Sequence, residues 1–292
     1  MTHPQSPLRS EDWSARMRAT IGLGVAGNFT GHLEQAGEAD DFREVASTSA
    51  DAPKGIFPFF VPGDGDHFLH RMPVSSTTLA LGLEGEKHQI EPEVALLCDL
   101  TYDGDQVVAL SPRYAAAHND CSIRRPGARK ISEKKNWGAN TKGTASQMIA
   151  LDRFDRGGVL DQYRIASFLL RDGELFGYGV DSEVTGYSYY GDRLIQWLIE
   201  KMNGQEDQGP LEDIARWIQV AGQPAQALIS IGATRYTDYG ESTFLEVGDV
   251  ASVILYDAER YSSDDVRAWA DGSREPNVEG VSVLRQHVQR QP

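Results

Sequence analysis

Three carboxylates in the middle of the chain have the types and the spacing of metal ligands. Glu91 and Glu93 open an apolar run, residues 89–100, that we expect to form a β-strand, and side chains two positions apart on a strand project from the same face. Carboxylates held side by side repel each other unless a cation compensates their charge. After a strand, a turn and a second strand, the chain returns to these glutamates at Asp120. This third carboxylate would complete an all-oxygen site of the kind that binds Mg²⁺, Mn²⁺ or Ca²⁺.

A solvated strand edge is the alternative explanation for a Glu-x-Glu pair, because carboxylates are usually exposed. Here the pair leads directly into residues 94–98, a continuous apolar run that is typical of a strand covered on both faces. We therefore expect the two glutamates to lie in a buried site.

A basic segment follows the last of these carboxylates. Residues 124–142 contain seven lysines and arginines and one glutamate, in a chain whose formal net charge is −15. A solvated loop is the alternative, but the segment begins four residues after Asp120. Cations beside a metal site attract carboxylates and hold them in register, so we predict a small anionic ligand that contacts Arg124 and Lys135.

With these residues in place, the sequence resembles the fumarylacetoacetate hydrolase superfamily over most of its length. The segment 22–37, with Asn28, Phe29 and His32, is similar to the superfamily's amino-terminal histidine segment. Four further segments resemble the superfamily in the same order: the Glu-x-Glu strand at 90–97, Asn-Asp-x-Ser-x-Arg at 118–124, the lysine segment at 134–138 and the closing pattern at 226–255. The resemblance implies an α+β, mainly β fold, a mixed β-roll and β-sandwich with a few peripheral helices.

The resemblance also implies a role for each matched residue. Mg²⁺ or Mn²⁺, with Ca²⁺ as a further candidate, is expected at Glu91, Glu93 and Asp120, and no other cofactor is expected. The implied activity is that of a hydrolase or lyase that cleaves carbon–carbon bonds in small oxo acids or 1,3-dicarbonyl compounds. The implied catalytic residues are His32, Glu34 and Lys135, and the implied substrate-binding residues are Arg124, Asn119, Ser122, Gly232 and Thr234.

Position 35 departs from the superfamily pattern. The superfamily carries a glutamate three residues after its histidine, whereas this chain has Gln35 there and an acid at Glu34. Neighbouring positions on a helix differ by about 100° of rotation. We expect a shifted register that pairs Glu34 with His32; in an unshifted register Gln35 would face the metal. The loss of the glutamate leaves a second function open, a non-catalytic or weakly catalytic protein that binds a metabolite or a metal.

The elements that position these residues are mainly strands. Asp103-Gly104 and Asp172-Gly173 predict tight turns between paired strands, and residues 194–202, 211–218 and 262–270 have the pattern of helices. We expect an N-terminal segment, 1–60, that carries the His32 helix and a possible lid at 40–55. A metal-binding catalytic domain, 61–258, and a polar C-terminal extension, 259–292, would follow.

Several other functions are excluded. The acidic charge argues against general binding to nucleic acid, which requires a basic surface. Gly22, Gly24 and Gly27 match a dinucleotide-binding pattern, but no apolar strand precedes Gly22, so close backbone packing explains them better. No run approaches the roughly 20 apolar residues that span a bilayer, and we expect a cytoplasmic protein with free thiols at Cys98 and Cys121. The resemblance implies a homodimer.

Overall fold

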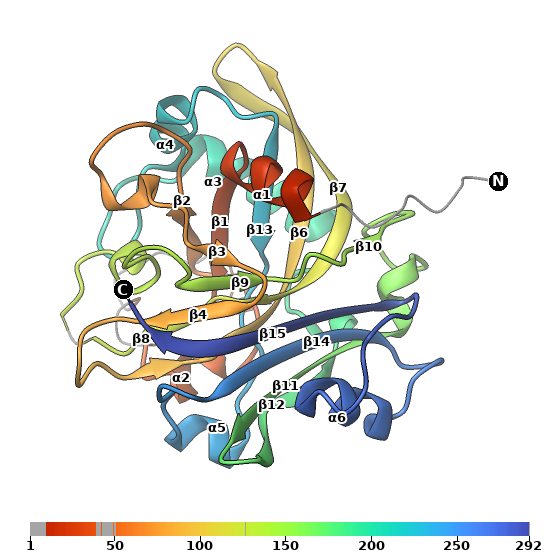
Figure 1. Cartoon of the computed structure of the whole chain (residues 1–292). Helices are drawn as coiled ribbons and strands as arrows, with labels where there is room; N and C mark the ends of the chain where they lie inside the picture. Colours follow the sequence, from red (N-terminus) through yellow and green to blue (C-terminus); the bar gives the residue numbers. More distant parts are fainter. Residues whose placement is uncertain (1–9, 39–41, 43–48, 50, 126, 292) are drawn as a thin grey trace.

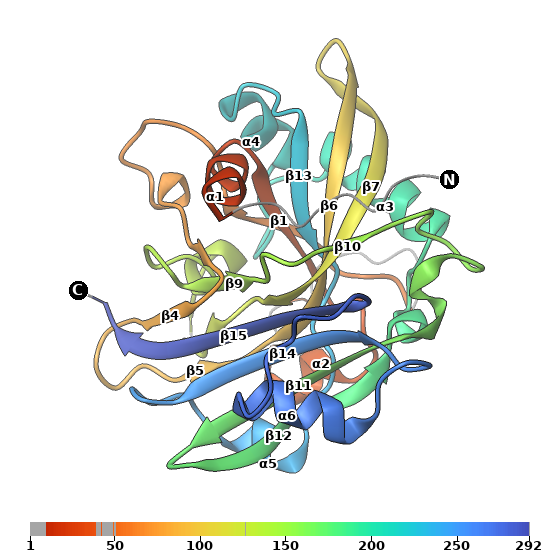
Figure 2. The same ribbon diagram turned by 45° about the vertical axis from the view of Figure 1, so that its right-hand side comes forward.

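The computed structural model describes residues 10–38, 42, 49, 51–125 and 127–291. Two curved sheets pack against each other, and the expected mainly β, α+β fold is confirmed (Figures 1 and 2). The larger sheet has the strand order β2-β1-β13-β6-β7-β9-β3, with β10 added beside β7. Its strands are β1 (Ile21–Ala26), β2 (Gly55–Phe60), β3 (Val74–Ser75), β6 (Pro92–Asp103), β7 (Gln106–Asn119), β9 (Lys142–Thr144), β10 (Ile149–Ala150) and β13 (Gln226–Ser230).

The smaller sheet has the order β12-β11-β14-β15-β4. Its strands are β4 (Thr78–Leu81), β11 (Tyr163–Arg171), β12 (Glu174–Glu183), β14 (Val250–Asp257) and β15 (Val281–Arg290). A two-stranded ribbon joins β5 (His88–Gln89) to β8 (Ser122–Ile123). Both predicted turns are present, because β6 pairs with β7 and β11 pairs with β12 across them.

The C-terminal segment differs from the expected extension. β15 lies between β14 and β4 inside the smaller sheet, and its residues Ser282 and Gln286 are fully buried. The N-terminal segment is also part of the main structure, since β1 pairs with β13 in the larger sheet. Most of the possible lid at 40–55 lies outside the described residues.

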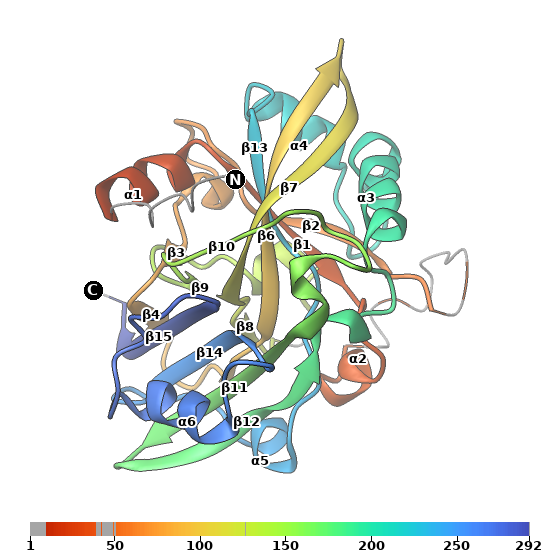
Figure 3. The same cartoon turned by 90° about the vertical axis from the view of Figure 1, so that its right-hand side faces the viewer.

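Helices cover the outer faces of the two sheets. Figure 3 shows α1 and α3 on opposite sides of the larger sheet, while α6 lies against the smaller one. The helices are α1 (Ser10–Arg18), α2 (His32–Gln35), α3 (Asp192–Gly204), α4 (Ile214–Val220), α5 (Asp238–Ser242) and α6 (Ser263–Asp271), with single 3₁₀ turns η2 (Phe68–His70), η3 (Ile131–Lys134), η4 (Val159–Gln162) and η5 (Val184–Gly186). Among the described residues, no helix is long and apolar enough to cross a bilayer.

Side chains from both sheets share one apolar core. Leu96 and Ala115 of the larger sheet belong to the same buried cluster as Val253 and Leu284 of the smaller sheet. Hydrogen bonds also join the sheets, because the Ala117 backbone N–H donates to Ser282 Oγ at 3.0 Å.

The glycines of β1 make room for aromatic rings. A Cβ added at Gly22 would lie 2.2 Å from the Phe59 ring, and one added at Gly24 would lie 2.3 Å from the Phe57 ring. Close packing of strand against ring therefore explains these two glycines of the Gly-x-Gly-x-x-Gly pattern, as expected from the sequence.

Candidate metal centre

The β6–β7 hairpin brings the three carboxylates together. Pro92 pairs with Asn119, and one step further along the Asp120 backbone N–H donates to the Glu91 carbonyl oxygen at 3.0 Å. One oxygen from each of Glu91, Glu93 and Asp120 lies within 4.8 Å of the others. These residues are 3%, 2% and 0% exposed, so they do not form a solvated strand edge.

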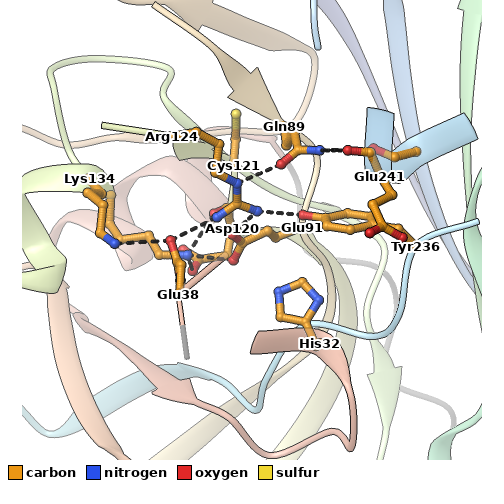
Figure 4. A network of polar contacts seen from close by, with 12 residues as sticks. His32, Glu38, Gln89, Glu91, Asp120, Cys121, Arg124, Lys134, Tyr236 and Glu241 are labelled. Carbon is orange, nitrogen blue, oxygen red and sulfur yellow. Dashed lines mark hydrogen bonds and ion pairs between the residues drawn. The ribbon is translucent and has the colours of Figure 1, made fainter. Parts of the chain in front are cut away.

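Two cations of the basic segment contact the carboxylates, and Lys135 is the one that lines the cavity. Lys135 Nζ, which follows η3, lies 2.5 Å from Glu91 Oε2 and 2.5 Å from Asp120 Oδ2. The Arg124 guanidinium lies 2.9 Å from Glu91 Oε1. Figure 4 shows this network of ion pairs around Glu91 and Asp120. The basic segment thus delivers Arg124 and Lys135 to the carboxylates, although their contact with a substrate stays a prediction.

The two glutamates have opposite electrostatic surroundings. Burial alone would raise the pKa of Glu91, but Lys135 and Arg124 hold that pKa well below its ordinary range. Burial and the neighbouring Asp120 carboxylate raise the pKa of Glu93 well above its ordinary value. A bound divalent cation would favour the ionised form of Glu93, because it compensates the repulsion between the carboxylates.

The donor set suits a hard divalent cation. All three ligand atoms are carboxylate oxygens, and the described residues place no cysteine sulfur or histidine nitrogen in this group. Oxygen-only sites are typical of magnesium, manganese and calcium. Cys121 adjoins Asp120 but is buried, and burial raises the pKa of its thiol to about 12, so the thiolate form is suppressed.

His32 lines the same cavity as the carboxylates and Lys135. Its Nδ1 lies 2.9 Å from the Thr234 carbonyl oxygen. A carbonyl only accepts hydrogen bonds, so Nδ1 carries the proton and Nε2 keeps a lone pair. Burial lowers the pKa of His32, against the opposing effect of Glu91, and the neutral ring is therefore favoured near neutral pH.

The expected pairing of His32 with Glu34 is wrong, and the unshifted alternative is not present either. Glu34 is exposed. Gln35 Nε2 donates to the Tyr236 carbonyl, and Gln35 Oε1 accepts from the Tyr236 N–H, so the amide is held by backbone and does not face the carboxylates. α2 is a single turn, and its short length leaves neither side chain directed into the cavity.

Glu38 occupies the cavity instead, and the sequence reasoning missed it. The chain reverses after α2 because Gly37 adopts φ +69°, and the Glu38 N–H bonds to the Leu33 carbonyl while the Gly37 N–H bonds to the Glu34 carbonyl. This is the Schellman pattern that ends many helices. Glu38 Oε1 then lies 2.8 Å from Arg124 and 3.1 Å from Lys134. In the sequence, Gly37 marks the end of this helix, and it therefore indicates that the chain reverses just before Glu38.

The remaining expected substrate-binding residues, Asn119, Ser122, Gly232 and Thr234, do not line the cavity. Asn119 Oδ1 accepts from the Glu91 N–H, and the Gly232 N–H donates to Glu93 Oε2 at 2.8 Å. Thr234 offers its carbonyl to His32, and Ser122 Oγ is buried beside the hairpin. Asn119, Gly232 and Thr234 thus orient the carboxylates and the imidazole, whereas Ser122 Oγ has no hydrogen-bond partner among the described residues. Ala233 is the residue of the 232–234 loop that lines the cavity.

The cavity is narrow. Its volume of about 20 Å³ is roughly the space that one water or one ion needs. A larger ligand therefore requires side chains such as Glu38 or Lys135 to move aside.

Comparison with solved structures identifies the class of fold. The inhibitor complex of Cg1458 matches with a TM-score of 0.53 at 14% identity, covering 93% of this chain and 77% of that one. A 2-keto-3-deoxy-D-arabinonate dehydratase complexed with magnesium and 2,5-dioxopentanoate matches with a TM-score of 0.50 at 14% identity, covering 93% of this chain and 74% of that one. The chain has the fold of the fumarylacetoacetate hydrolase superfamily.

Within that fold class, the sequence itself matches one family model. Residues 38–288 match DUF5718, a family of unknown function, and the chain belongs to this family. No curated protein matches the sequence.

Proposed function

We propose that this protein is a divalent-metal-dependent enzyme that cleaves carbon–carbon bonds in small oxo acids or 1,3-dicarbonyl compounds, as a hydrolase or a lyase. The observation that carries the proposal is the cavity shared by the buried carboxylates Glu91, Glu93 and Asp120, the ammonium of Lys135 and the neutral imidazole of His32. A metal site, a cation and a base within one cavity are the parts that this chemistry requires.

The bound ligands of the dehydratase support the substrate class. That protein was solved with magnesium and 2,5-dioxopentanoate, an oxo acid, on the same fold. The carboxylates in this chain are the oxygen ligands that magnesium or manganese prefers. We therefore propose Mg²⁺ or Mn²⁺ as the cofactor and a small oxo-acid anion as the substrate.

Each residue has a defined role in the proposed reaction. Glu91, Glu93 and Asp120 would hold the cation, which when bound would polarise a substrate carbonyl. His32 Nε2 would accept a proton from water or from the substrate, because Nδ1 is held by Thr234. Lys135 would stabilise the negative charge that develops as the bond breaks.

A panel of acylpyruvates and oxaloacetate, assayed with manganese, tests the proposal. Turnover of at least one compound that stops with chelator and returns with manganese supports an enzyme. The alternative function is that of a non-catalytic binding protein. The observation on its side is that, among the described residues, no carboxylate directly contacts His32. Oxalate binding without turnover across the whole panel would support that alternative.

The metal ligands have their own test. Manganese at about 100 times its dissociation constant should stabilise the native state by roughly 2.7 kcal/mol, measured as a rise in Tm over a sample with chelator. Asp120→Asn should abolish most of this rise. The matched control is Asp105→Asn at an exposed position, which should keep it. An undiminished rise in Asp120→Asn would remove Asp120 from the ligand set.

The oligomeric state and the location stay predictions. We propose a homodimer, which light scattering on the purified protein would test. We also propose a cytoplasmic location, which fractionation of the native cells would test.

A further inference from the structure

Lys142 is a fully buried lysine that the proposed reaction does not use. It begins β9, is 0% exposed, and is held by backbone pairing on both sides, to β3 at Val74 and to β7 through Gly143. Its backbone N–H donates to the Pro73 carbonyl at 3.0 Å, and its carbonyl accepts from Gln286 Nε2 at 3.2 Å. The position of the Lys142 backbone is therefore fixed by three neighbouring segments.

The Lys142 ammonium contacts a carboxylate of the metal centre from behind. Nζ lies 2.8 Å from Asp120 Oδ1 and donates to the Cys121 carbonyl at 2.6 Å. Among the described residues that line the cavity, Lys135 is present and Lys142 is not. A substrate in the cavity would thus meet Lys135, while Lys142 acts only through Asp120.

The two oxygens of Asp120 are divided between the two lysines. Oδ1 forms an ion pair with Lys142, and Oδ2 lies 2.5 Å from Nζ of the cavity-lining Lys135. A buried ammonium without its partner is strongly destabilising, so Lys142 does not release Oδ1 at low cost. Asp120 can therefore offer Oδ2 to a cation once the cavity-lining Lys135 moves aside, while Oδ1 stays engaged by the buried Lys142.

The same restriction applies to the second glutamate. Glu93 Oε2 accepts the Gly232 N–H at 2.8 Å, which leaves Oε1 for a cation. Ca²⁺ takes six to eight oxygen ligands and often binds carboxylates through both oxygens, whereas Mg²⁺ and the similar Mn²⁺ suit octahedral sites with single-oxygen carboxylates and several waters. With Asp120 and Glu93 each limited to one oxygen, the centre disfavours Ca²⁺.

We infer that Lys142 is a positioning residue that makes Asp120 a one-oxygen ligand and thereby selects Mn²⁺ and Mg²⁺ over Ca²⁺. The inference rests on the proposed metal centre. It assigns the selectivity of that centre to a residue that contacts neither the cation nor the substrate.

The test measures the dissociation constants of Mn²⁺ and Ca²⁺ by calorimetry, without any activity assay. We expect the wild-type protein to bind Mn²⁺ at least about tenfold more tightly than Ca²⁺. Lys142→Met removes the donor that occupies Asp120 Oδ1 and should shrink the ratio of the two constants by about tenfold, mainly through tighter Ca²⁺ binding. Lys142→Gln keeps a donor at this position and should retain most of the ratio. Lys87→Gln, at an exposed lysine, is the matched control and should leave the ratio unchanged.

The outcomes separate this inference from the proposed function. Equal affinity of the wild type for Mn²⁺ and Ca²⁺, or an unchanged ratio in a folded Lys142→Met variant, would overturn the inference while leaving the metal centre intact. Binding of neither ion would overturn the proposed function together with the inference. If circular dichroism shows that Lys142→Met is unfolded, Lys142→Ala, which also removes the donor, takes its place, and an unchanged ratio in that variant would equally overturn the inference.

Discussion

His32 combines burial with a fixed tautomer. Its Nδ1 is committed to the Thr234 carbonyl, and burial lowers the pKa of the ring, so the uncharged form with a free Nε2 lone pair dominates near neutral pH. Such a ring can accept a proton without first losing one. Among the residues at the end of α2, Glu38 carries the negative charge that acts on this ring, in addition to the larger effect of Glu91. Glu34 and the uncharged Gln35 do not contribute.

The pH dependence of activity should follow from this protonation state. Protonation of His32 requires a pH below its ordinary pKa of 6.5, so kcat/KM should stay level down to that pH and fall below it. The free energy of unfolding should also decrease as the pH falls from 6.5 towards the lower pKa of the native His32 ring, because the unfolded chain binds this proton at a higher pH than the native state does.

His32→Ala should lower kcat by about 10² to 10⁴, and His287→Ala, at an exposed histidine, should not. Full activity of His32→Ala would remove the ring from the reaction.

β15 is the element that supports the metal centre from the other sheet. Gln286 Oε1 accepts from Asn119 Nδ2 at 3.1 Å, and its Nε2 donates to the Thr78 carbonyl at 2.8 Å and to the Lys142 carbonyl. Asn119 in turn accepts the Glu91 N–H. The C-terminal strand therefore fixes the backbone that carries a metal ligand.

Gln286→Leu should destabilise the protein and weaken metal binding together. The substitution leaves the Asn119 amide and buried carbonyls without partners, and each unsatisfied group costs about 1–3 kcal/mol. Chemical denaturation should show a loss in that range or above, with a smaller manganese-induced rise in Tm. Gln289→Leu changes an exposed glutamine of the same strand and should have little effect. A metal response that survives unchanged in Gln286→Leu would mean that β15 stabilises the fold without orienting the centre.

The two sheets share one apolar core. α1 packs through Trp13 and Met17 on the larger sheet, α6 packs through Trp269 on the smaller one, and a shared core joins the sheets between them. The segments that we expected at the two ends of the chain therefore carry strands of the main sheets, because β1 and β15 each pair within them.

Unfolding should accordingly be a single transition. Met17→Ala and Trp269→Ala each remove a buried side chain, at about 3 kcal/mol each, and both should shift the same transition to lower denaturant concentration. Circular dichroism and tryptophan fluorescence should give coincident midpoints. Val108→Ala, at a side chain that is 51% exposed, is the control. Two separated transitions in either core variant would show that the sheets unfold independently.

The sequence predicted the parts of the centre that depend on local periodicity. Glu91 and Glu93 follow the two-residue repeat of a strand, and the Asp103-Gly104 turn returns the chain to Asp120. The residues that it missed depend on contacts that no repeat encodes. Glu38 reaches the cavity through the reversal at Gly37, and Gln286 contacts Asn119, behind the metal ligands, through packing between the sheets.

Gly24 sets the size of the cavity through a neighbour. The Phe57 ring packs against Gly24 and lines the cavity, and Lys135 Nζ lies 5.3 Å from the centre of that ring. A methyl group at position 24 would push that ring towards the ammonium. Across the family, positions 24 and 57 should therefore covary: a sequence with alanine or a larger residue at 24 should carry a smaller side chain than phenylalanine at 57, and natural variation at this pair would report how much substrate each member admits.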